Sequence, residues 1–472
     1  MPTVRRALLA APLGACLSML APDASAQQTP EPAAPPAASP GPAAEAPASA
    51  FPKPQVQDTG AAPLTLERAV ALASERNESV LAAGQVAEAA GARVARARAF
   101  FLPNLTASGT YTRRLRESTR EVGGQTVVLQ QFNALGANFT GRVALFDARG
   151  IPLYRAAKLE SEASQLDAVE TRRQVSFAAA NAFLVTLANQ QVYQAAEQRL
   201  AYARQGLADA QARATAGLAS TNDVTRAELE VATAEANLAA ALGTAETSRL
   251  ELGFLLVEPV KGELSPPEPL LADAVRPAPS LELLNQGATD RRPDILSAQL
   301  RVRSLRESAK EPLARLLPTV GATAQFRLTN EAGLNGNVGD GFLAVDLTWN
   351  LFDGGTRYAE RRERVANANA AELNTQAATR RVSVDIEQAR VNLETARAAL
   401  AQTEHAARAA RKNAAETGIL YRQGLSTALT VADASLSLFE AEVALARNRY
   451  GLGVALLGLR AAVGLNPLGK EP

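Results

Sequence analysis

Histidine and cysteine are almost absent from this chain of 472 residues, which has one of each. The histidine, His405, stands among alanines, which excludes a site of several histidines on one metal ion and argues against a histidine-based triad. The cysteine, Cys16, lies close to the start, so the chain beyond it has no thiol and no disulfide. We therefore expect no enzyme, no metal site and no cofactor.

An excess of charge is also missing, because 49 basic and 48 acidic residues give a net charge of +1. A nucleic-acid partner would require a basic stripe, and we expect none. Beyond the N-terminal region no eighteen consecutive residues are apolar, so no membrane-spanning helix is predicted. The segment Gly464 to Lys470 has the glycine and lysine spacing of a phosphate loop, but it follows a helical pattern and has Glu471 in place of the hydroxyl residue.

Proline is absent from two long stretches, Tyr154 to Glu258 and Thr319 to Asn466. The stretches align at an offset of 207 residues, which places Gly217-Leu218 on Gly424-Leu425. The chain is therefore a tandem duplication, and each unit holds a helical hairpin with glycine at its tip. A helix from about Pro152 to Ala216 would be roughly 100 Å long.

Apolar residues in these stretches alternate spacings of four and three, which is typical of a coiled-coil seam. The pattern is carried in the second unit by Val382, Ile386, Ala389, Leu393, Ala396 and Leu400, and after the tip by Val431, Ala434, Leu438, Ala441 and Leu445. A soluble coiled-coil scaffold shows the same periodicity. It remains an alternative on this evidence.

Before each hairpin lie segments in which apolar and polar residues alternate, and each of these regions begins after a proline, Pro103 or Pro318. Strands of about ten residues with one apolar face suit a transmembrane barrel, although a one-sided sheet on a soluble core looks the same. Each unit supplies two such strands, which gives four per chain. Because lipid tolerates no open sheet edge, several chains must share one barrel if these strands cross a membrane.

The N-terminus reads as a secretory signal over residues 1–26, with Arg5-Arg6, an apolar run and Ala24-Ser25-Ala26 before the cleavage point. Leu13 to Cys16 also fits a lipoprotein cleavage site, so lipidation of Cys16 stays open. Residues 27–62 are rich in proline and alanine and are expected to form a flexible tether.

The repeated plan resembles the TolC-like outer-membrane efflux proteins. The resemblance rests on the helix-to-strand Leu-Pro, on Leu145-Phe146-Asp147 and Leu351-Phe352-Asp353-Gly354-Gly355, and on the two Gly-Leu tips. Arg292-Pro293-Asp294 resembles a motif common in the branch that works with resistance-nodulation-division pumps. The resemblance implies an α+β fold in which a homotrimer closes a shared β-barrel, and long hairpins continue it as a periplasmic α-barrel.

The resemblance also implies a location and partners. The chain would be a passive exit duct in the outer membrane of a Gram-negative cell, contacting outer-membrane lipid and conducting small molecules such as drugs. It would work with a periplasmic adaptor protein and an inner-membrane pump, expected to be of the resistance-nodulation-division type. The alternative within this class is the exit duct of a type I protein secretion system.

The expected domains follow from the duplication. Residues 63–258 form the first repeat, 259–290 a proline-rich connector and 291–467 the second repeat, with 468–472 as the tail. The family resemblance implies that the connector lies at the equator of the α-barrel. Pro312 lies in the helix that leads to the second strand pair and should kink or shorten it. Segments Leu115 to Asn138 and Thr329 to Gly341 are expected to be external loops.

Site residues follow from the same resemblance. Gly217, Leu218, Gly424 and Leu425 would form the adaptor-docking tips. Asp433 and Thr430 would line the periplasmic aperture, where threonine replaces a second acidic ring. Asp223 and Tyr421 would latch the closed state, while Ser426 replaces the arginine of the family.

At the membrane boundary, Phe146, Asp147, Phe352 and Asp353 mark the return from strand to helix, as Pro103 and Pro318 mark the entry. The two aspartates are suited to cap the helices that follow. Phe100, Phe101, Phe146, Trp349 and Phe352 could form an interfacial aromatic girdle.

Overall fold

The computed structural model describes residues 63–331 and 337–471, all within the unit Pro52–Pro472. The expected signal, Cys16 and the expected tether lie outside the described residues. Among the described residues, no helix has both the length and the apolar character needed to cross a bilayer.

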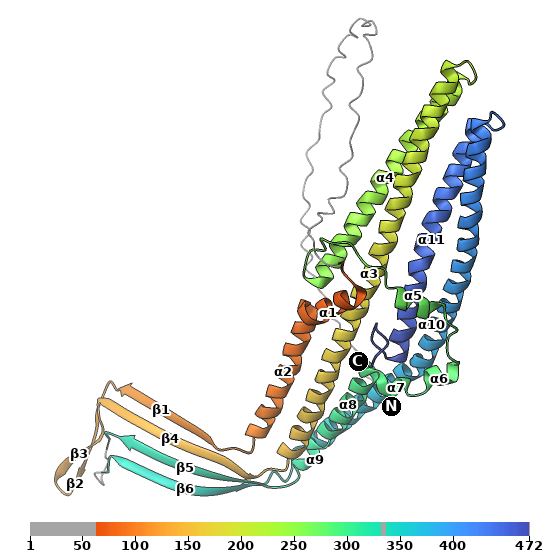
Figure 1. Cartoon of the computed structure of the whole chain (residues 1–472). Helices are drawn as coiled ribbons and strands as arrows, with labels where there is room; N and C mark the ends of the chain where they lie inside the picture. Colours follow the sequence, from red (N-terminus) through yellow and green to blue (C-terminus); the bar gives the residue numbers. More distant parts are fainter. Residues whose placement is uncertain (1–62, 332–336, 472) are drawn as a thin grey trace, which may run out of the picture. The chain divides into compact units, whose positions relative to one another are not determined.

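The first half of the described chain builds two short helices, four strands and a long hairpin (Figure 1). In order these are α1 Leu66–Arg76, α2 Glu78–Ala99, β1 Asn104–Arg113, β2 Ser118–Val122, β3 Gln125–Gln130, β4 Asn133–Phe146, α3 Gly150–Thr215 and α4 Thr221–Leu256. The connecting region holds α5 Glu268–Val275, α6 Leu281–Asn285 and α7 Ala288–Arg291. The second half comprises α8 Pro293–Ser308, α9 Glu311–Ala314, β5 Thr319–Thr329, β6 Gly339–Thr348, α10 Thr356–Arg422 and α11 Ala428–Val463.

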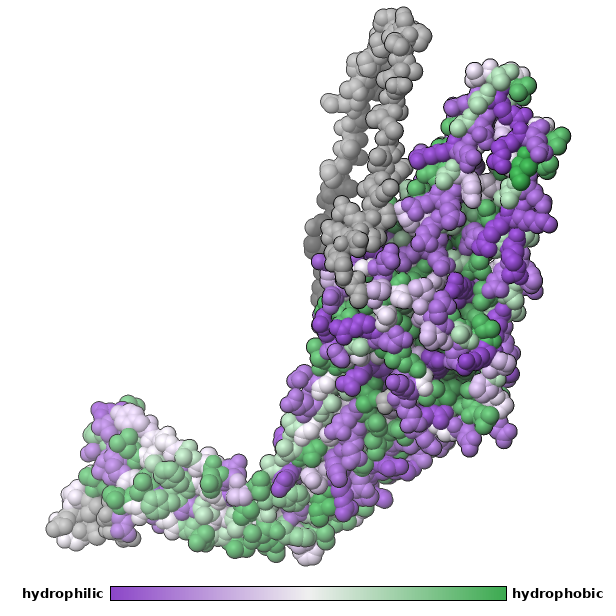
Figure 2. Space-filling view, viewed as in Figure 1, coloured by the Kyte–Doolittle hydropathy of each residue, from purple (hydrophilic) through white to green (hydrophobic). Residues whose placement is uncertain are grey.

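The four predicted strands form one antiparallel sheet in the order β1-β4-β5-β6. Phe139 of β4 pairs with Ala107 of β1 on one side and with Phe326 of β5 on the other. Leu105 and Leu343 lie on the same face of the sheet as Phe139, and their side chains are more than four-fifths exposed within the protomer. In the space-filling view, apolar and weakly polar residues cover much of the visible face of the strands (Figure 2).

The first external loop differs from the expectation of an irregular segment. Strand β4 already begins at Asn133, and β2 and β3 form a separate hairpin within the loop. Its turn is Gly123-Gly124, where φ is 63° and 83°, values that only glycine adopts without strain. Consecutive glycines between two short runs of β-forming residues are a hairpin signal.

The helical hairpins match the predicted periodicity. Helices α3 and α10 contain 66 and 67 residues, so each is about 100 Å long. Val382, Ile386 and Leu393 of the predicted seam are almost completely buried. Burying one such side chain stabilises the fold by about 1.5–3 kcal/mol.

The order of neighbours is the same in every layer of the protomer. In the sheet it is β1-β4-β5-β6. Among the helices next to the strands, α3 contacts α2 and α8, and α8 contacts α10. Further along, α3 contacts α4 and α11, and α11 contacts α10. One side of the protomer is therefore formed by β1, α2 and α4, and the other by β6 and α10.

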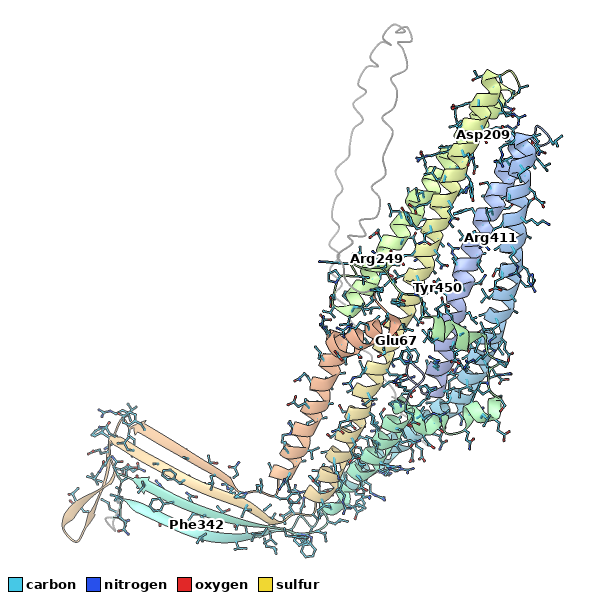
Figure 3. All side chains as sticks on the ribbon, viewed as in Figure 1. Glu67, Asp209, Arg249, Phe342, Arg411 and Tyr450 are labelled. Carbon is cyan, nitrogen blue, oxygen red and sulfur yellow. The ribbon has the colours of Figure 1, made fainter. Side chains whose placement is uncertain are left out.

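The main core lies where α1 and α5 pack against the hairpins. Phe183 and Leu184 of α3, Leu252 of α4 and Tyr450 of α11 are each at most 1% exposed. Tyr450 lies between the hairpins near this level (Figure 3). The core ties the first hairpin to the second near the middle of α3 and α10, and the tips lie far from it.

The connecting region is ordered by ionic contacts with the second hairpin. Arg449 of α11 pairs with Glu268 at 2.9 Å, and Arg460 pairs with Asp273 at 2.7 Å. Arg397 of α10 donates to the carbonyl oxygen of Ala274. As predicted for Pro312, α8 ends at Ser308, and the separate turn α9 holds the proline in its first residues, where the missing N–H costs nothing.

Candidate functional site

The hairpin tips, residues 217–220 and 424–427, share one backbone design. Gly217 and Gly424 have φ of 71° and 79°, and the following leucine N–H closes the helix on the carbonyl five residues back. The next helix starts at Ser220 or Thr427, whose hydroxyl accepts a backbone N–H. Leu218 and Leu425 are left 71% and 73% exposed. Each tip therefore presents one apolar side chain on a rigid turn.

Asp223 and Thr430 occupy equivalent positions in the two repeats, three residues after the N-cap. The Asp223 carboxylate accepts from the backbone N–H of Ser220 at 3.1 Å and completes a capping box. The Thr430 hydroxyl lies 2.9 Å from the hydroxyl of Thr427. Both side chains therefore serve the start of their own helix.

Asp433 lies one turn beyond Thr430 on the same face of α11 and is exposed. No ion pair involves it within the described part of the chain. It lines a cavity of about 500 Å³ between the hairpins, whose other walls include Tyr202 of α3, Leu229 of α4 and Tyr421 of α10. The structure thus brings Asp433 and Tyr421 to one cavity near the tips.

Tyr421 contacts the first hairpin through Arg213. The guanidinium of Arg213, in the last turn of α3, lies over the Tyr421 ring at 4.7 Å and donates to the Tyr421 carbonyl oxygen. A Cβ on Gly424 would lie 3.5 Å from the Arg213 Nη2 atom. We call the Arg213–Tyr421 contact the clip. It joins the two tips of one protomer.

The expected pairing of Asp223 with Tyr421 is not formed within the protomer. No hydrogen bond joins the two among the described residues, because the Asp223 carboxylate is engaged in its capping box. Burial raises the pKa of Tyr421, Arg213 opposes this, and the charges of Asp223 and Asp209 add to the rise. Asp223 therefore acts on Tyr421 through its charge.

Among the residues that the structure describes, the buried hydroxyl of Tyr421 has no hydrogen-bond partner. An unpaired buried hydroxyl costs about 1–3 kcal/mol. Tyr421 as a residue is 7% exposed, and its ring makes the contact with Arg213. The clip thus depends on the aromatic face and the backbone carbonyl of residue 421.

Arg213 was missed by sequence reasoning, although the repeat offers a signal for it. The position equivalent to Arg213 in the second unit is Leu420, next to Tyr421, which is equivalent to Ala214. Where a charged or aromatic residue occurs in only one of the two aligned repeats, the folding of a single hairpin does not require it. Comparing the repeats position by position near the tips would have selected this pair.

The two junction aspartates behave differently. Asp353 is not the N-cap of α10, which is Gly355, but its carboxylate accepts from the backbone N–H groups of Gly355 and Arg357 at 3.0 and 3.1 Å and so satisfies one N–H in the first turn of α10. Asp147 accepts from the N–H and guanidinium of Arg149, and α3 has no side-chain cap. The prediction of a cap was wrong for Asp147. Gly354 and Gly355 have positive φ and turn the chain over the Asp353 carboxylate, whereas the residues after Asp147 include no glycine before the helix.

Arginine contacts set the charge of both carboxyl groups. Burial raises the pKa of each aspartate, but hydrogen bonds from Arg149 to Asp147 and from Arg357 to Asp353 outweigh it, so that both pKa values lie below the ordinary range. Both side chains are therefore anionic at neutral pH. Pro103 and Pro318 directly precede β1 and β5, as predicted.

Aromatic side chains gather at the same junctions. Phe100 and Phe101 pack edge to face with their ring centroids 5.5 Å apart. Trp349 donates its indole N–H to the carbonyl oxygen of Leu316 at 3.0 Å. Phe146 and Phe352 are both exposed within the protomer. The five aromatic residues of the expected girdle thus lie at the ends of strands, where the chain enters or leaves the sheet.

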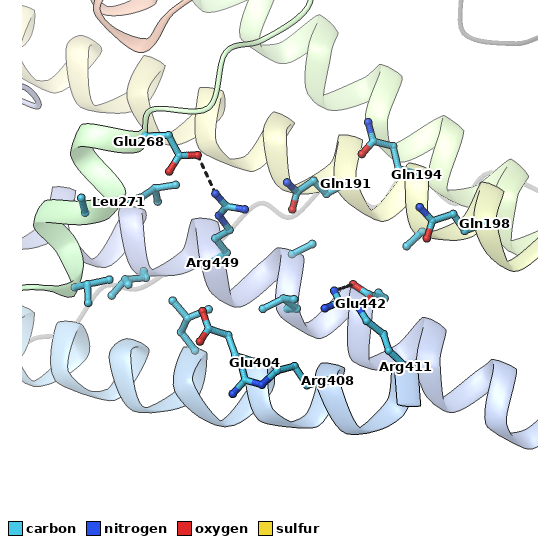
Figure 4. Close-up of a pocket in the computed structure, with 17 residues that line it drawn as sticks. Gln191, Gln194, Gln198, Glu268, Leu271, Glu404, Arg408, Arg411, Glu442 and Arg449 are labelled. Atoms are coloured by element: carbon cyan, nitrogen blue, oxygen red, sulfur yellow. Dashed lines mark hydrogen bonds and ion pairs between the residues drawn. The ribbon is translucent and has the colours of Figure 1, made fainter. Parts of the chain in front are cut away.

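A second cavity, of about 720 Å³, lies between the hairpins beside α5 (Figure 4). Its charges are largely paired: Glu268 with Arg449, and Arg411 with Glu442 at 2.9 Å between Nη2 and Oε2. Gln191, Gln194 and Gln198 of α3 form the opposite wall. Within the described residues no three metal-ligating side chains cluster.

Comparison with known proteins agrees with this architecture. Residues 69–256 and 284–465 match the family described as outer membrane efflux protein. The chain is 26% identical over 380 residues to the outer membrane efflux protein BepC of Brucella suis biovar 1 (strain 1330), which covers 79% of each chain.

Solved structures show the same fold. The outer membrane protein VceC of Vibrio cholerae is 18% identical, with a TM-score of 0.70 over 85% of this chain and 96% of that one. The open state of the MtrE outer membrane channel of Neisseria gonorrhoeae is 20% identical, with a TM-score of 0.69 over 86% of this chain and 90% of that one. The predicted α+β fold of four strands and two coiled-coil hairpins is confirmed. With both repeats matched, the chain belongs to the outer membrane efflux protein family.

Proposed function

We propose that the chain is one protomer of a homotrimeric, passive exit duct in the outer membrane. The observation that carries this is the identical order of neighbours in every layer. Strands β1 and β6 each have one unpaired edge in the protomer, and lipid does not tolerate unpaired backbone groups. Pairing β6 of one protomer with β1 of the next satisfies both edges and places α10 against the α2 and α4 of that neighbour.

Head-to-tail contacts of this kind close into a ring when the rotation per protomer divides a full turn. Four strands from each of three protomers give a barrel of twelve, within the range of known outer-membrane barrels. Repeats 63–258 and 291–467 would then each contribute two strands and one hairpin, and the connector 259–290 would surround the α-barrel at its equator. Apolar residues such as Leu105 and Leu343 would face lipid.

The tips would dock a periplasmic adaptor. Their exposed leucines, Leu218 and Leu425, directly follow the glycines of the turns. They would anchor the helices of the adaptor, whose apolar residues would bind in the groove between the two helices of a hairpin. Energy and substrate choice would come from an inner-membrane pump, for which we propose the resistance-nodulation-division type. Arg292 of the supporting motif pairs with Asp294 at 2.7 Å and approaches Asp385 of α10 at 3.6 Å, so within the protomer it joins α8 to α10.

The gate would consist of Asp433 and Thr430 around the threefold axis. Three Asp433 carboxylates close to one axis repel one another and attract multivalent cations. Thr430 adds no charge, so the ring would carry three carboxylates. The clip holds the two tips of each protomer together, and its release would widen the aperture.

Two measurements test the proposal. The purified protein should be trimeric in detergent by light scattering, and deleting its gene should raise susceptibility to small toxic compounds without altering the export of any protein. A monomer that conducts ions in planar bilayers would refute the shared barrel. Loss of a secreted protein with unchanged susceptibility would assign the duct to type I secretion.

A further inference from the structure

A cavity between α2 and α3 lies directly below the strands and is lined by groups of opposite character. Its volume is about 310 Å³. Arg93 and Arg96 of α2 form one wall, and Phe100, Leu153 and Ala157 supply apolar surface. We propose that this cavity binds the phosphate headgroup and the first part of an acyl chain of a phospholipid from the periplasmic leaflet of the outer membrane.

The depth of the arginines fits a headgroup. Phe100 is the C-cap of α2 and stands four residues before β1, so in the proposed duct it lies near the boundary of the apolar layer. At 1.5 Å per residue, Arg96 lies about 6 Å and Arg93 about 10 Å below it. The polar layer on each side of a bilayer is roughly 5–8 Å thick, and arginine side chains extend toward the level where their charge is solvated.

The charges of the cavity call for an anion. Neither Arg93 nor Arg96 forms an ion pair with another described residue. The cavity lining contains one carboxylate, Glu160, which pairs with Arg301 at 3.5 Å. A phosphate accepts several N–H groups from guanidinium at once, so it suits two arginines spaced one helical turn apart.

The helix-to-strand junction before β5 in the second repeat contains ion pairs that Arg93 and Arg96 lack in the first. Before β5, Arg315 pairs with Glu311 and Glu360 at 2.8 Å each, and Arg364 pairs with Glu311 at 3.2 Å. Guanidinium charges at that junction are thus neutralised by carboxylates of the chain itself. At the first junction, arginines without such partners face a hollow, which indicates an anion supplied from outside the chain.

The shape of the cavity is fixed by a close backbone approach. A Cβ on Gly150 would come within 2.6 Å of the rings of Phe100 and Phe101, so glycine allows both rings to lie against the start of α3. The ring of Phe100 and the side chain of Leu153 form an apolar surface of the cavity, on the side of the arginines that is closer to the strands. This apolar surface favours a lipid over free phosphate, because inorganic phosphate would leave it in contact with water.

Labelled-lipid binding tests the proposal. The trimer in nanodiscs of phosphatidylcholine should enrich spin-labelled phosphatidylglycerol over spin-labelled phosphatidylcholine. Arg93→Gln and Arg96→Gln should each lower this preference about fivefold. Arg98→Gln is the matched control, since it removes the same charge from an exposed residue of the same helix that does not line the cavity. Ala157→Leu fills part of the cavity without changing charge and should also weaken binding.

Three outcomes would overturn the proposal. An equal loss in Arg98→Gln would mean general attraction to the basic helix. Displacement of the labelled lipid by millimolar inorganic phosphate would mean a simple anion site. Unchanged binding in Ala157→Leu would exclude the acyl chain from the cavity. Conductance of the variants in planar bilayers should equal that of the unaltered protein, so failure here leaves the exit-duct proposal intact.

Discussion

The guanidinium of Arg213 lies 4.7 Å from the ring centroid of Tyr421 and joins the last turn of α3 to the last turn of α10. Arginine contributes both a cation–π contact and a hydrogen bond to the Tyr421 carbonyl oxygen. Ser426 stands where the family resemblance would place an arginine. Arg213 of the first hairpin instead contacts the tip region of the second hairpin.

Removing the clip should open the duct. Arg213→Ala loses both contacts, worth about 1–3 kcal/mol per protomer, and should increase single-channel conductance or open probability in planar bilayers. Arg204→Ala is the control, because Arg204 pairs with Glu235 within the first hairpin. Equal currents in Arg213→Ala and the unaltered protein would show that the clip does not hold the closed state.

The ring of Tyr421, and not its hydroxyl, should matter. Tyr421→Phe removes an unpartnered buried hydroxyl, so we expect unchanged closure and equal or greater thermal stability. Tyr421→Ala should open the channel as Arg213→Ala does. Combining Tyr421→Phe with Asp223→Ala should raise conductance only through the lost helix cap, worth about 1 kcal/mol. An open channel in Tyr421→Phe alone would assign the latch to the hydroxyl.

Asp433 should set the ionic behaviour of the aperture. Asp433→Asn removes the proposed ring of carboxylates, so cation selectivity should fall and block by trivalent cations from the periplasmic side should disappear. Glu440→Gln, on an exposed residue of the same helix, is the charge-matched control. If the control has the same effect as Asp433→Asn, or if Asp433→Asn changes neither property, Asp433 does not line the aperture.

Docking at the tips should depend on positive φ. Gly424→Val forces a β-branched residue into a conformation with φ of 79°, at a cost of about 1–2 kcal/mol, and should reduce adaptor-dependent efflux while the trimer still assembles. Gly418→Val lies near the end of α10, the helix that precedes this turn, where a Cβ meets nothing within 4 Å, and serves as the control. Drug susceptibility should rise in the first variant alone. Unchanged susceptibility in Gly424→Val would argue against docking there.

Acid should destabilise the second strand-to-helix junction. Because the pKa of Asp353 is lowered in the fold, its stabilising effect is complete above the ordinary aspartate pKa of about 3.9 and is lost as the pH falls through the lowered value. The unfolding temperature of the trimer should therefore drop below about pH 4. Asp353→Asn should lower it at neutral pH and flatten this drop, and an unaltered slope would contradict the prediction.

Sequence periodicity was sufficient for the long elements because burial imposes it. Ile386 and Leu393 had to face a partner helix, and Leu343 and Val345 lie on the face of β6 opposite Asp346 because strand side chains alternate. The clip was not predictable in this way. It depends on which side chain crosses from one hairpin to the other, and that follows from packing between elements more than two hundred residues apart.

Local signals failed where two similar segments had different neighbours. Asp147 and Asp353 follow the same Leu-Phe pair, yet only Asp353 accepts a backbone N–H from the first turn of the next helix, because two glycines with positive φ follow it. The preference for aspartate before a helix identifies a suitable residue type, but it does not determine whether the backbone turns so that the carboxylate reaches the N–H groups of the helix. That turn was readable from Gly354-Gly355 once both repeats were compared.

The two long helices also act as a ruler. Since α3 and α10 run unbroken through both helical layers, the distance from the sheet to each tip is fixed by residue count. A deletion in one helix alone would leave the two tips at different heights. Removing one heptad from each of α3, α4, α10 and α11 would shorten the reach by about 10 Å while keeping every seam in register. Such a shortened duct would meet its partners only in a cell whose two membranes lie closer together.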